Sequence, residues 1–524
     1  MQPHRGELEN IAGKKKKTLK RHYLTLAVQN LNNKKYPVAG KKKKMEENKI
    51  INEETKTEKT AKGGQMSKRT RKAITITATA LLTVAVFFAG YFTKYFSIHE
   101  IARSLDFILN IYDKHYCSVD GETPSSVEIT KTLANAFIGD YADRYSEYFS
   151  PEDKTADDKE SNGERLGVGI AFLSDFTVYS VSGNSPAEQA GLKAGGKVTA
   201  FKSGTSDVWT AATTENDGFN GFKSFLNGIG SGDTVCLKIE YSGGEAFEYE
   251  MAKKAYNQTF VYYADQSGYY GYGDQSGEMQ LNKTDRVTSL DGVALSEIDE
   301  KTGYIRLTQF SGLKSGLYGG AGQFAGALNK FKSQNRKNLI LDLRGNGGGF
   351  VSILAEIAPY LCPYDGGKSA CMVAVDKNGG RDVTKTSSKS KYGDYDFEKI
   401  VILADDGSAS ASEALIGAVL DYDKSSGKNA VTVILSPSVS KIDGVSVTEY
   451  KTYGKGIMQT TYTNVLTGEA FKLTTAVIRW PVSDICIHGV GVTSALNQKL
   501  GRNAVLDGGF NGKGDFASAL NALK

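Results

Sequence analysis

A serine-dense turn between an apolar run and a helix-like segment is the part of this chain best suited to nucleophilic chemistry. Residues 400–403 read I-V-I-L, as in a buried strand, and residues 404–418 read A-D-D-G-S-A-S-A-S-E-A-L-I-G-A. A turn that opens a helix presents free backbone N–H groups and the positive end of the helix dipole. Such groups stabilise the oxyanion that forms when a hydroxyl attacks a carbonyl. Serine and glycine also cap ordinary helices, so the turn alone leaves a purely structural interpretation open.

A glycine-rich loop upstream offers further backbone donors. Residues 338–349 read N-L-I-L-D-L-R-G-N-G-G-G, a buried strand that runs into glycines, and a helix is expected over 351–361. Glycine lets backbone N–H groups approach a ligand closely, so the loop predicts half of an oxyanion hole. A tight strand-to-helix turn is one alternative. A dinucleotide-binding loop using Gly345 and Gly347 is another, although its last glycine would be misplaced.

A lysine between two glycines is the candidate general base. Residues 452–459 read T-Y-G-K-G-I-M-Q, which places Lys455 between Gly454 and Gly456. A lysine acts as a base only if burial lowers its pKa toward neutrality, and a tight glycine setting allows that burial. A solvated loop lysine is the alternative.

Histidines, cysteines and metal motifs do not point to another mechanism. No histidine is near the serine turn in sequence, although this does not exclude a Ser-His-Asp triad. The chain has no H-E-x-x-H motif and no cysteines at zinc-ligand spacing, so no metal is expected. Five cysteines in a chain of 524 residues do not make a disulfide scaffold, although Cys362 and Cys371 are close enough in sequence to pair.

In this order, the motifs closely resemble those of the carboxyl-terminal processing peptidases, also called tail-specific proteases. The resemblance covers roughly residues 97–497, and three further segments support it: Y-S-E-Y-F-S-P-E-D (145–153), G-Y-I-R-L-T-Q-F (303–310) and I-H-G-V-G-V-T (487–493). The resemblance implies a PDZ-containing serine protease that uses a Ser–Lys dyad, without a metal or other cofactor.

The resemblance also implies roles for individual residues. Ser410 matches the nucleophile, Lys455 the general base, and Gln459 the residue that orients the lysine. The oxyanion hole would consist of the backbone N–H groups of Gly348 and Ala411. If the register of the serine motif differs, the alternative nucleophiles are Ser408 and Ser412.

Three features depart from the family pattern. The stretch between Ser410 and Lys455 is longer than usual and contains an inserted loop within residues 423–451. Gly347 stands where proline is common. A Tyr/Gly-rich stretch over residues 262–274 has no identifiable counterpart. These features bear on loop geometry more than on the chemistry.

The segment from 166 to 254 resembles a PDZ domain. Its G-V-G-I motif (Gly167, Val168, Gly169, Ile170) stands where PDZ domains bind a peptide carboxylate, and there a peptide adds to the sheet as a strand. Residues 194–201 (A-G-G-K-V-T-A-F) differ from the usual PDZ ending. A structural domain that no longer binds peptides is therefore an alternative.

Residues 73–93 are uncharged and long enough to cross a bilayer as one helix. The basic stretch 67–72 predicts that the N-terminus is cytoplasmic and that everything after residue 93 is outside; a cleaved signal peptide is the alternative.

Residues 1–72 carry a net charge of +14 and the rest −9, so the outer part gives no sign of nucleic-acid binding. The sequence K-G-G-Q before Met66 fits a ribosome-binding site read in frame. This suggests a bacterial start at Met66, with a genuine disordered tail as the alternative.

The expected fold is an α/β protease core of the crotonase- or Clp-like type with an inserted PDZ-like domain, an N-terminal helical segment and one transmembrane helix. We expect a single-pass bacterial membrane protein with an extracytoplasmic serine endopeptidase that cleaves proteins having accessible C-termini, as a homodimer or with an activating partner. A catalytically silent PDZ scaffold is the alternative. The expected regions are 1–72 (basic tail, of which 1–65 could be untranslated), 73–93 (anchor), 97–158 (helical segment), 160–255 (PDZ-like), 256–300 (Tyr/Gly-rich connector), 301–499 (core) and 500–524 (tail).

Overall fold

The computed structural model describes residues 77, 82, 84–86, 100–115, 124–215, 218–285, 287–442, 445–509 and 514–524. The chain divides into two compact units, Met1–Cys117 and Ser118–Lys524. The predicted basic tail lies outside the described residues, and so does most of the predicted membrane anchor. Within the part of the chain that is described, no helix combines the length and the apolar character needed to span a membrane. The first unit contains helix α3 (Glu100–His115).

An eight-stranded sheet forms the centre of the second unit, in the order β12-β11-β10-β15-β16-β19-β20-β25. Strands β15, β16, β19, β20 and β25 are parallel, and β10, β11 and β12 extend the sheet as antiparallel strands. The parallel strands are apolar runs because both faces of the sheet are covered. The bounds are β10 (Val261–Asp265), β11 (Gly268–Gln275), β12 (Glu278–Thr284), β15 (Thr302–Leu307), β16 (Asn338–Asp342), β19 (Lys399–Ala404), β20 (Val431–Leu435) and β25 (Val505–Asp507).

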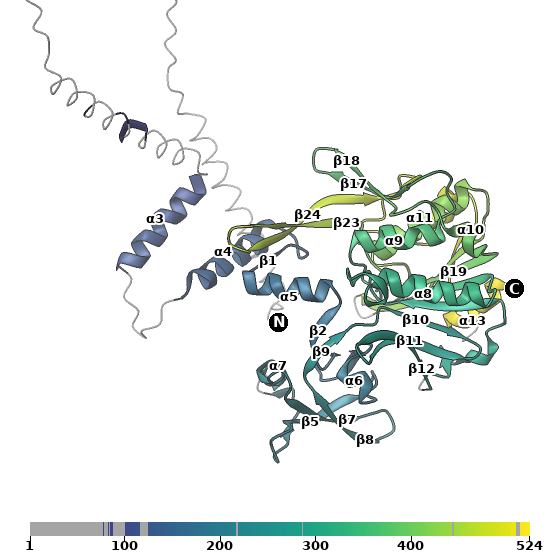
Figure 1. Cartoon of the computed structure of the whole chain (residues 1–524), viewed down its shortest axis with the longest axis horizontal. Coiled ribbons are helices and arrows are strands. Elements are labelled where there is room, and N and C mark those ends of the chain that lie inside the picture. Colours follow the sequence, from purple (N-terminus) through teal and green to yellow (C-terminus); the bar gives the residue numbers. More distant parts are fainter. Residues whose placement is uncertain are drawn as a thin grey trace, which may run out of the picture. The chain divides into compact units, whose positions relative to one another are not determined.

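Helices cover both faces of this sheet, which confirms the predicted α/β class. The main apolar core joins one face to α8 (Gly320–Ser333), α9 (Val351–Leu361) and α11 (Ala411–Ser425), which lie together in Figure 1. A second cluster joins the other face to α13 (Asp515–Leu523). The crotonase- or Clp-like assignment within this class stays a prediction.

The regions expected as a connector and a tail are parts of the core. Tyr263 stacks on Tyr270 at 4.7 Å on the α8 side of the sheet, and Tyr262 stacks on Tyr269 at 5.7 Å on the other side. Successive tyrosines therefore point to opposite faces of the sheet, and residues 256–300 contain strands β10 and β11. At the other end, residues 500–524 supply β25 and α13.

The N-terminal segment of this unit joins a second, smaller sheet. Helix α4 (Ser126–Tyr141) is followed by β1 (Glu147–Phe149) and α5 (Pro151–Ser161), whose start is capped by Ser150. Strand β1 pairs with β24, which also pairs with β23, the strand that follows Lys455. The other strands of the smaller sheet are β17 (Ala370–Asp376), β18 (Arg381–Lys385), β23 (Ile457–Thr463) and β24 (Ala470–Arg479).

Residues 164–257 form a β-rich region with an apolar core of its own. The ring of Phe222, on α7, is fully buried and contacts Phe172, Phe176 and Phe201. Residues 197–203 form a regular strand although their sequence departs from the PDZ pattern. The elements are β2 (Glu164–Gly167), β3 (Ile170–Phe172), β4 (Val178–Val181), α6 (Pro186–Gln189), β5 (Lys197–Ser203), β6 (Thr210–Ala211), α7 (Gly218–Gly228), β7 (Thr234–Glu240), β8 (Ala246–Ala252) and β9 (Lys254–Asn257).

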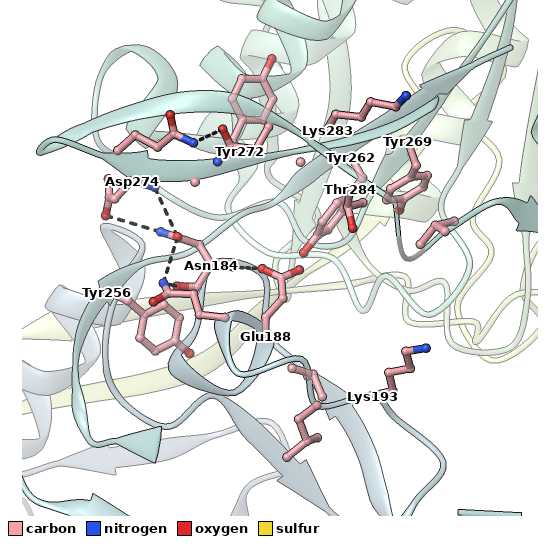
Figure 2. Close-up of a pocket in the computed structure, with 18 of the residues that line it drawn as sticks. Asn184, Glu188, Lys193, Tyr256, Tyr262, Tyr269, Tyr272, Asp274, Lys283 and Thr284 are labelled. Atoms are coloured by element: carbon pink, nitrogen blue, oxygen red, sulfur yellow. Dashed lines mark hydrogen bonds between the residues drawn. The ribbon is translucent and has the colours of Figure 1, made fainter. Parts of the chain in front are cut away.

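A cavity of about 840 Å³ lies between this β-rich region and strands β11 and β12 (Figure 2). Asn184 donates from Nδ2 to the carbonyl of Asn257 at 2.7 Å and to Asp274 Oδ2 at 3.4 Å. Figure 2 shows Glu188 and Lys193 of the β-rich region on one side and Tyr262 and Tyr269 of the sheet on the other. Asn257 also donates from Nδ2 to Asp274 Oδ2 at 2.8 Å, so the contacts of both asparagines with Asp274 on β11 attach the β-rich region to the central sheet.

The structure differs from two local expectations, one about the inserted loop and one about a pair of cysteines. The predicted inserted loop within residues 423–451 contains strand β20 and a hairpin, β21 (Pro437–Ile442) with β22 (Val445–Tyr450). Cys362 and Cys371 are both buried and free, so the disulfide left open by their spacing is absent. Burial raises the pKa of the Cys371 thiol to about 12, which keeps it protonated.

Candidate active site

Ser410 is the accessible serine of the turn and has an unusual backbone conformation. It precedes α11 with φ +56° and ψ −113°, a region that non-glycine residues rarely occupy. Ser408 and Ser412 are buried, and their hydroxyls donate at 2.8 Å to the carbonyls of Leu343 and Asn346. The two flanking serines therefore fasten the turn to the glycine loop, while Ser410 is only half-buried.

The glycine loop lies directly against the serine turn. Gly348 has φ +97°, and a Cβ added there would be 2.8 Å from both Ser410 Cβ and the Ala411 nitrogen. Ala411 is the first residue of α11, so its N–H has no acceptor within the helix. The structure thus brings Gly348, Ser410 and Ala411 together.

Asn346 fixes the glycine loop, and the sequence motifs did not single it out. Its side chain is fully buried and donates from Nδ2 to the carbonyl of Leu307 at 2.8 Å. The N–H of Gly348 donates to Asn346 Oδ1 at 2.9 Å. One of the two predicted oxyanion donors is therefore engaged within the loop in this structure.

An arginine–aspartate pair holds the start of the same loop. Asp342 ends β16, is fully buried and accepts from Arg344 Nε at 2.9 Å and from Nη2 at 2.6 Å. Burial alone would raise the pKa of Asp342, but the hydrogen bonds and charge of Arg344 hold it below its usual value. Arg344 also donates from Nη1 to Asp291 at 2.7 Å. The D-L-R letters of the motif therefore encode a rigid support for the loop.

Glu413 connects the serine turn to the lysine segment. Its Oε2 accepts from the N–H of Ser410 and from the N–H of Lys455, each at 2.9 Å. Its Oε1 accepts from the N–H of Gly454 at 2.8 Å and from the hydroxyl of Thr452. The side chain is 1% exposed, and burial raises its pKa above the usual value although all four hydrogen bonds favour the ionised form. The sequence showed this glutamate only as a letter of the serine motif.

Lys455 is half-buried, and its surroundings favour the neutral amine. Burial, the largest influence, lowers its pKa below the usual 10.5, and the charges of Lys472 and Arg144 act in the same direction. Tyr145 and Asp143 act against this shift. The amine lies over the ring of Tyr145, 4.4 Å from the centroid. Depression of the lysine pKa is the condition that a lysine base requires.

Gln459 lies on β23, four residues beyond Lys455, but its side chain is engaged elsewhere. Its Nε2 donates to Thr474 Oγ1 on the neighbouring strand β24 at 3.0 Å. The structure therefore places Gln459 in the right neighbourhood without showing a contact that orients the lysine.

The predicted peptide-binding loop has the backbone features of a tight turn. Gly169 has φ +80°, and a Cβ there would be 2.1 Å from that of Ser185. The carbonyl of Val168 accepts from Ala187 at 3.0 Å and that of Gly169 accepts from Ser182 at 2.8 Å. Strand β3, which begins at Ile170 after Gly167 has ended β2, pairs only with β4 among the described strands. Its second edge could accept another strand.

No group of three or more histidine, cysteine or carboxylate side chains that could hold a metal occurs in the described part of the chain. The residues around Ser410 combine an accessible hydroxyl, an amine of lowered pKa and a free N–H at a helix start. These groups can perform nucleophilic acyl transfer.

Comparisons with known proteins identify the same region. Residues 301–433 match the model of peptidase family S41. A "Probable CtpA-like serine protease" of Staphylococcus epidermidis is 23% identical over 395 residues, covering 74% of this chain and 64% of that protein. A protein of the same description from Staphylococcus saprophyticus is 24% identical over 401 residues, with 76% and 64% covered. The chain thus spans less than two thirds of the length of these curated relatives.

Among solved structures, the photosystem II D1 C-terminal processing protease matches with a TM-score of 0.39 and 19% identity. The match covers 71% of this chain and 82% of that one.

Proposed function

Residues 301–433 belong to peptidase family S41, and on this basis we propose that the chain is a serine endopeptidase that cuts protein substrates near their C-termini. One observation carries the proposal: Oε2 of Glu413 binds the backbone N–H groups of both Ser410 and Lys455. A single oxygen atom thereby fixes the nucleophile segment beside the base segment. A protease needs the serine and the lysine side by side, whereas a simple peptide binder needs neither residue.

In the proposed reaction, the neutral amine of Lys455 takes the proton of Ser410 Oγ as that oxygen attacks the scissile carbonyl. The N–H groups of Ala411 and Gly348 bind the oxyanion. The lysine then protonates the leaving amine, and water releases the acyl group from the serine. No metal or other cofactor takes part.

Three contacts must form before this reaction can run as proposed. The amine of Lys455, which lies over the ring of Tyr145, has to reach Ser410 Oγ. The N–H of Gly348 has to turn from Asn346 Oδ1 toward the oxyanion, and the amide of Gln459 has to leave Thr474 to contact the lysine. Substrate binding is the natural trigger, since catalytic hydrogen bonds often align only in the complex.

The β-rich region is proposed to act as a PDZ domain that selects substrate or gates the site. The support is the open edge of β3 beside the loop Gly167–Ile170, where a peptide C-terminus could add as a strand. Removal of residues 166–254 should change the rate at which an unstructured substrate is cut. An unchanged rate would remove the gating role.

The cellular setting is proposed from the sequence. The uncharged run 73–93 with basic residues before it supports a membrane anchor and an extracytoplasmic protease. A homodimer or an activating partner belongs to the same proposal. Protease protection of the intact cell, assayed with a C-terminal tag, tests the orientation.

The first test is cleavage of an unfolded protein such as casein by the full chain, beside Ser410→Ala and Lys455→Ala. Cleavage by the parent and by neither variant is the expected result. Cleavage by Ser410→Ala would overturn the assignment of the nucleophile.

A catalytically silent peptide-binding scaffold is the second candidate. The engaged donors at Gly348 and Gln459 favour it, because a silent site has no need to align them. A serine-reactive phosphonate probe separates the two candidates: an enzyme is labelled at Ser410, and a silent scaffold is not.

A further inference from the structure

We propose that Tyr145 is a positioning residue for the proposed dyad, because its ring covers the Lys455 amine and keeps water away from it. This inference rests on the proposed function, in which Lys455 is the general base. Tyr145 lies 310 residues before Lys455 in sequence, and the resemblance assigned it no role. Its contact with the amine exists only in the folded protein.

The contact is close, and the ring is held in place from its other end. Lys455 Nζ lies 4.4 Å from the centroid of the Tyr145 ring. The ring hydroxyl accepts from Arg144 Nη2 at 2.7 Å and lies 3.2 Å from the hydroxyl of Tyr453. Arg144 also binds the Tyr453 hydroxyl. The three side chains form a polar clamp that keeps the face of the ring toward the lysine.

The backbone under the ring is anchored on the same small sheet that carries the lysine segment. Asp143 Oδ1 accepts from the N–H of Tyr145 at 2.8 Å and from the hydroxyl of Ser146 at 3.3 Å. Burial would raise the pKa of Asp143, but the nearby hydroxyl of Thr474, on β24, helps to lower it below its usual value. Residues 147–149 then pair with β24 as strand β1. The ring is thus placed by a short segment that is folded by Asp143 and whose C-terminal end pairs with β24.

Charges around the amine come from each element packed beside it. Arg144 and Lys472 disfavour the protonated amine, whereas Asp143 favours it. From α11, Glu413 binds the lysine backbone, and the backbone of His488 lies 2.8 Å from where a Cβ on Gly456 would be. Of these groups, only Arg144 is held by the Tyr145 hydroxyl, and a change at Tyr145 releases that contact while Arg144 keeps its contact with Tyr453.

The ring itself has two opposing effects on the amine. Its π face attracts the ammonium form, which is worth up to about 2 kcal/mol when desolvated. Its bulk excludes water, and full desolvation can lower a lysine pKa by about 3–5 units. Burial by all the surrounding groups is the largest influence on this half-buried amine and lowers its pKa, whereas the charge interaction with Tyr145 raises it. Because the ring lies directly over the amine, we expect the water admitted by its loss to outweigh the lost attraction and to raise the pKa.

The test measures the pKa of Lys455 directly, without turnover. The full chain is treated with acetic anhydride over a range of pH, and the rate of Lys455 acetylation is followed by peptide mass spectrometry, with Lys472 as the internal reference. Only the neutral amine reacts. In Tyr145→Ala the midpoint should rise by about one pH unit, and in Tyr145→Phe it should stay within about 0.3 units. Tyr145→Leu keeps an apolar cover without the π face, so its midpoint should be at or below that of the parent.

A midpoint that is unchanged or lower in Tyr145→Ala, or raised equally in the Leu and Ala variants, would overturn the inference. If Tyr145→Ala does not fold, the Phe and Leu variants still distinguish exclusion of water by the ring from attraction of the ammonium group by its π face. A rise of the acetylation midpoint in Tyr145→Leu would contradict the exclusion of water. The pH profile of casein cleavage is the second measurement, and its acid limb should move with the acetylation midpoint. Because acetylation needs no catalysis, the cover is tested even if the parent fails to cut casein. Labelling of Ser410 by the phosphonate probe then decides between a gated protease and a silent scaffold.

Discussion

The proposed nucleophile and the proposed base are carried by two different kinds of sheet. Ser410 follows β19, a strand in the middle of the central sheet, and the helix after it is buried along most of its length. Lys455 precedes β23, at the edge of the smaller antiparallel sheet, and is half-buried. Close packing on both faces leaves the nucleophile little freedom, whereas the base can respond to its surroundings. The difference suggests that the activity of this site is adjusted from the side of the lysine.

The strongest way to break this arrangement is to change the carboxylate that joins its two halves. Glu413→Gln keeps the shape but turns an NH₂ group toward N–H donors that now bind oxygen. We expect cleavage to fall by at least about 100-fold and the free energy of unfolding to drop by about 3 kcal/mol, since buried donors lose their acceptor. Denaturant unfolding and casein assays measure the two effects. Glu356→Gln, at an exposed position of α9, is the matched control and should change neither.

A methyl group on the glycine loop should disturb the nucleophile side alone. In Gly348→Ala the new Cβ would be 2.7 Å from the carbonyl oxygen of Ala409, at a φ that alanine rarely adopts. We expect about a 100-fold loss of kcat, the size of effect seen when an oxyanion donor is removed. Gly347→Ala has open space around its Cβ and should be tolerated. Equal losses in both variants would contradict the assigned geometry.

The role of Lys455 should be visible in the pH dependence of the activity. Because the pKa of Lys455 is lowered from 10.5, the neutral amine that accepts the proton is populated at a lower pH than in a free lysine. Activity should therefore rise with pH on an acid limb whose midpoint lies below 10.5, by about tenfold for each pH unit beneath that midpoint. The pH profile of kcat/KM for a peptide substrate measures it. An acid limb at or above 10.5 would mean that the lysine is solvated during catalysis.

The smallest effects are expected from the serines that only fasten the turn. Ser412→Ala removes the bond to the carbonyl of Asn346 and should cost about 1 kcal/mol of unfolding free energy, with kcat within about threefold of the parent. Ser410→Ala should show the reverse pattern, with activity lost and stability kept. Thermal melts beside kinetic assays compare them. Loss of activity in Ser412→Ala at full stability would reopen the choice of nucleophile.

Much of the central fold could be predicted from the sequence because it depends on local pattern. The apolar runs of β16 and β19 and helix α9 lie where they were expected, since buried parallel strands and helices leave a direct trace in composition. The strands of the Tyr/Gly-rich stretch could not be predicted in the same way. Its tyrosines are buried on both sides of the sheet, so the sequence shows no alternation of polar and apolar residues.

The candidate site was predictable as a set of motifs but not as a set of contacts. The roles of Asn346 and Glu413 depend on hydrogen bonds between segments far apart in sequence, and no spacing rule encodes such bonds. The clamp of Arg144, Tyr145 and Tyr453 is invisible for the same reason. What a motif supplies is the identity of the reacting groups; their supports appear only once the sheets are assembled.

The four hydrogen bonds of Glu413 could hold this site together even if the chain were cut between Ser410 and Lys455. The hairpin β21–β22 lies between Ser410 and Lys455 in sequence, and Val439 on it is 67% exposed. A single cut there would leave the serine fragment and the lysine fragment still joined by one carboxylate and by the surrounding core. The protein is thus a candidate for a split enzyme, in which two separately made pieces restore one site when they meet.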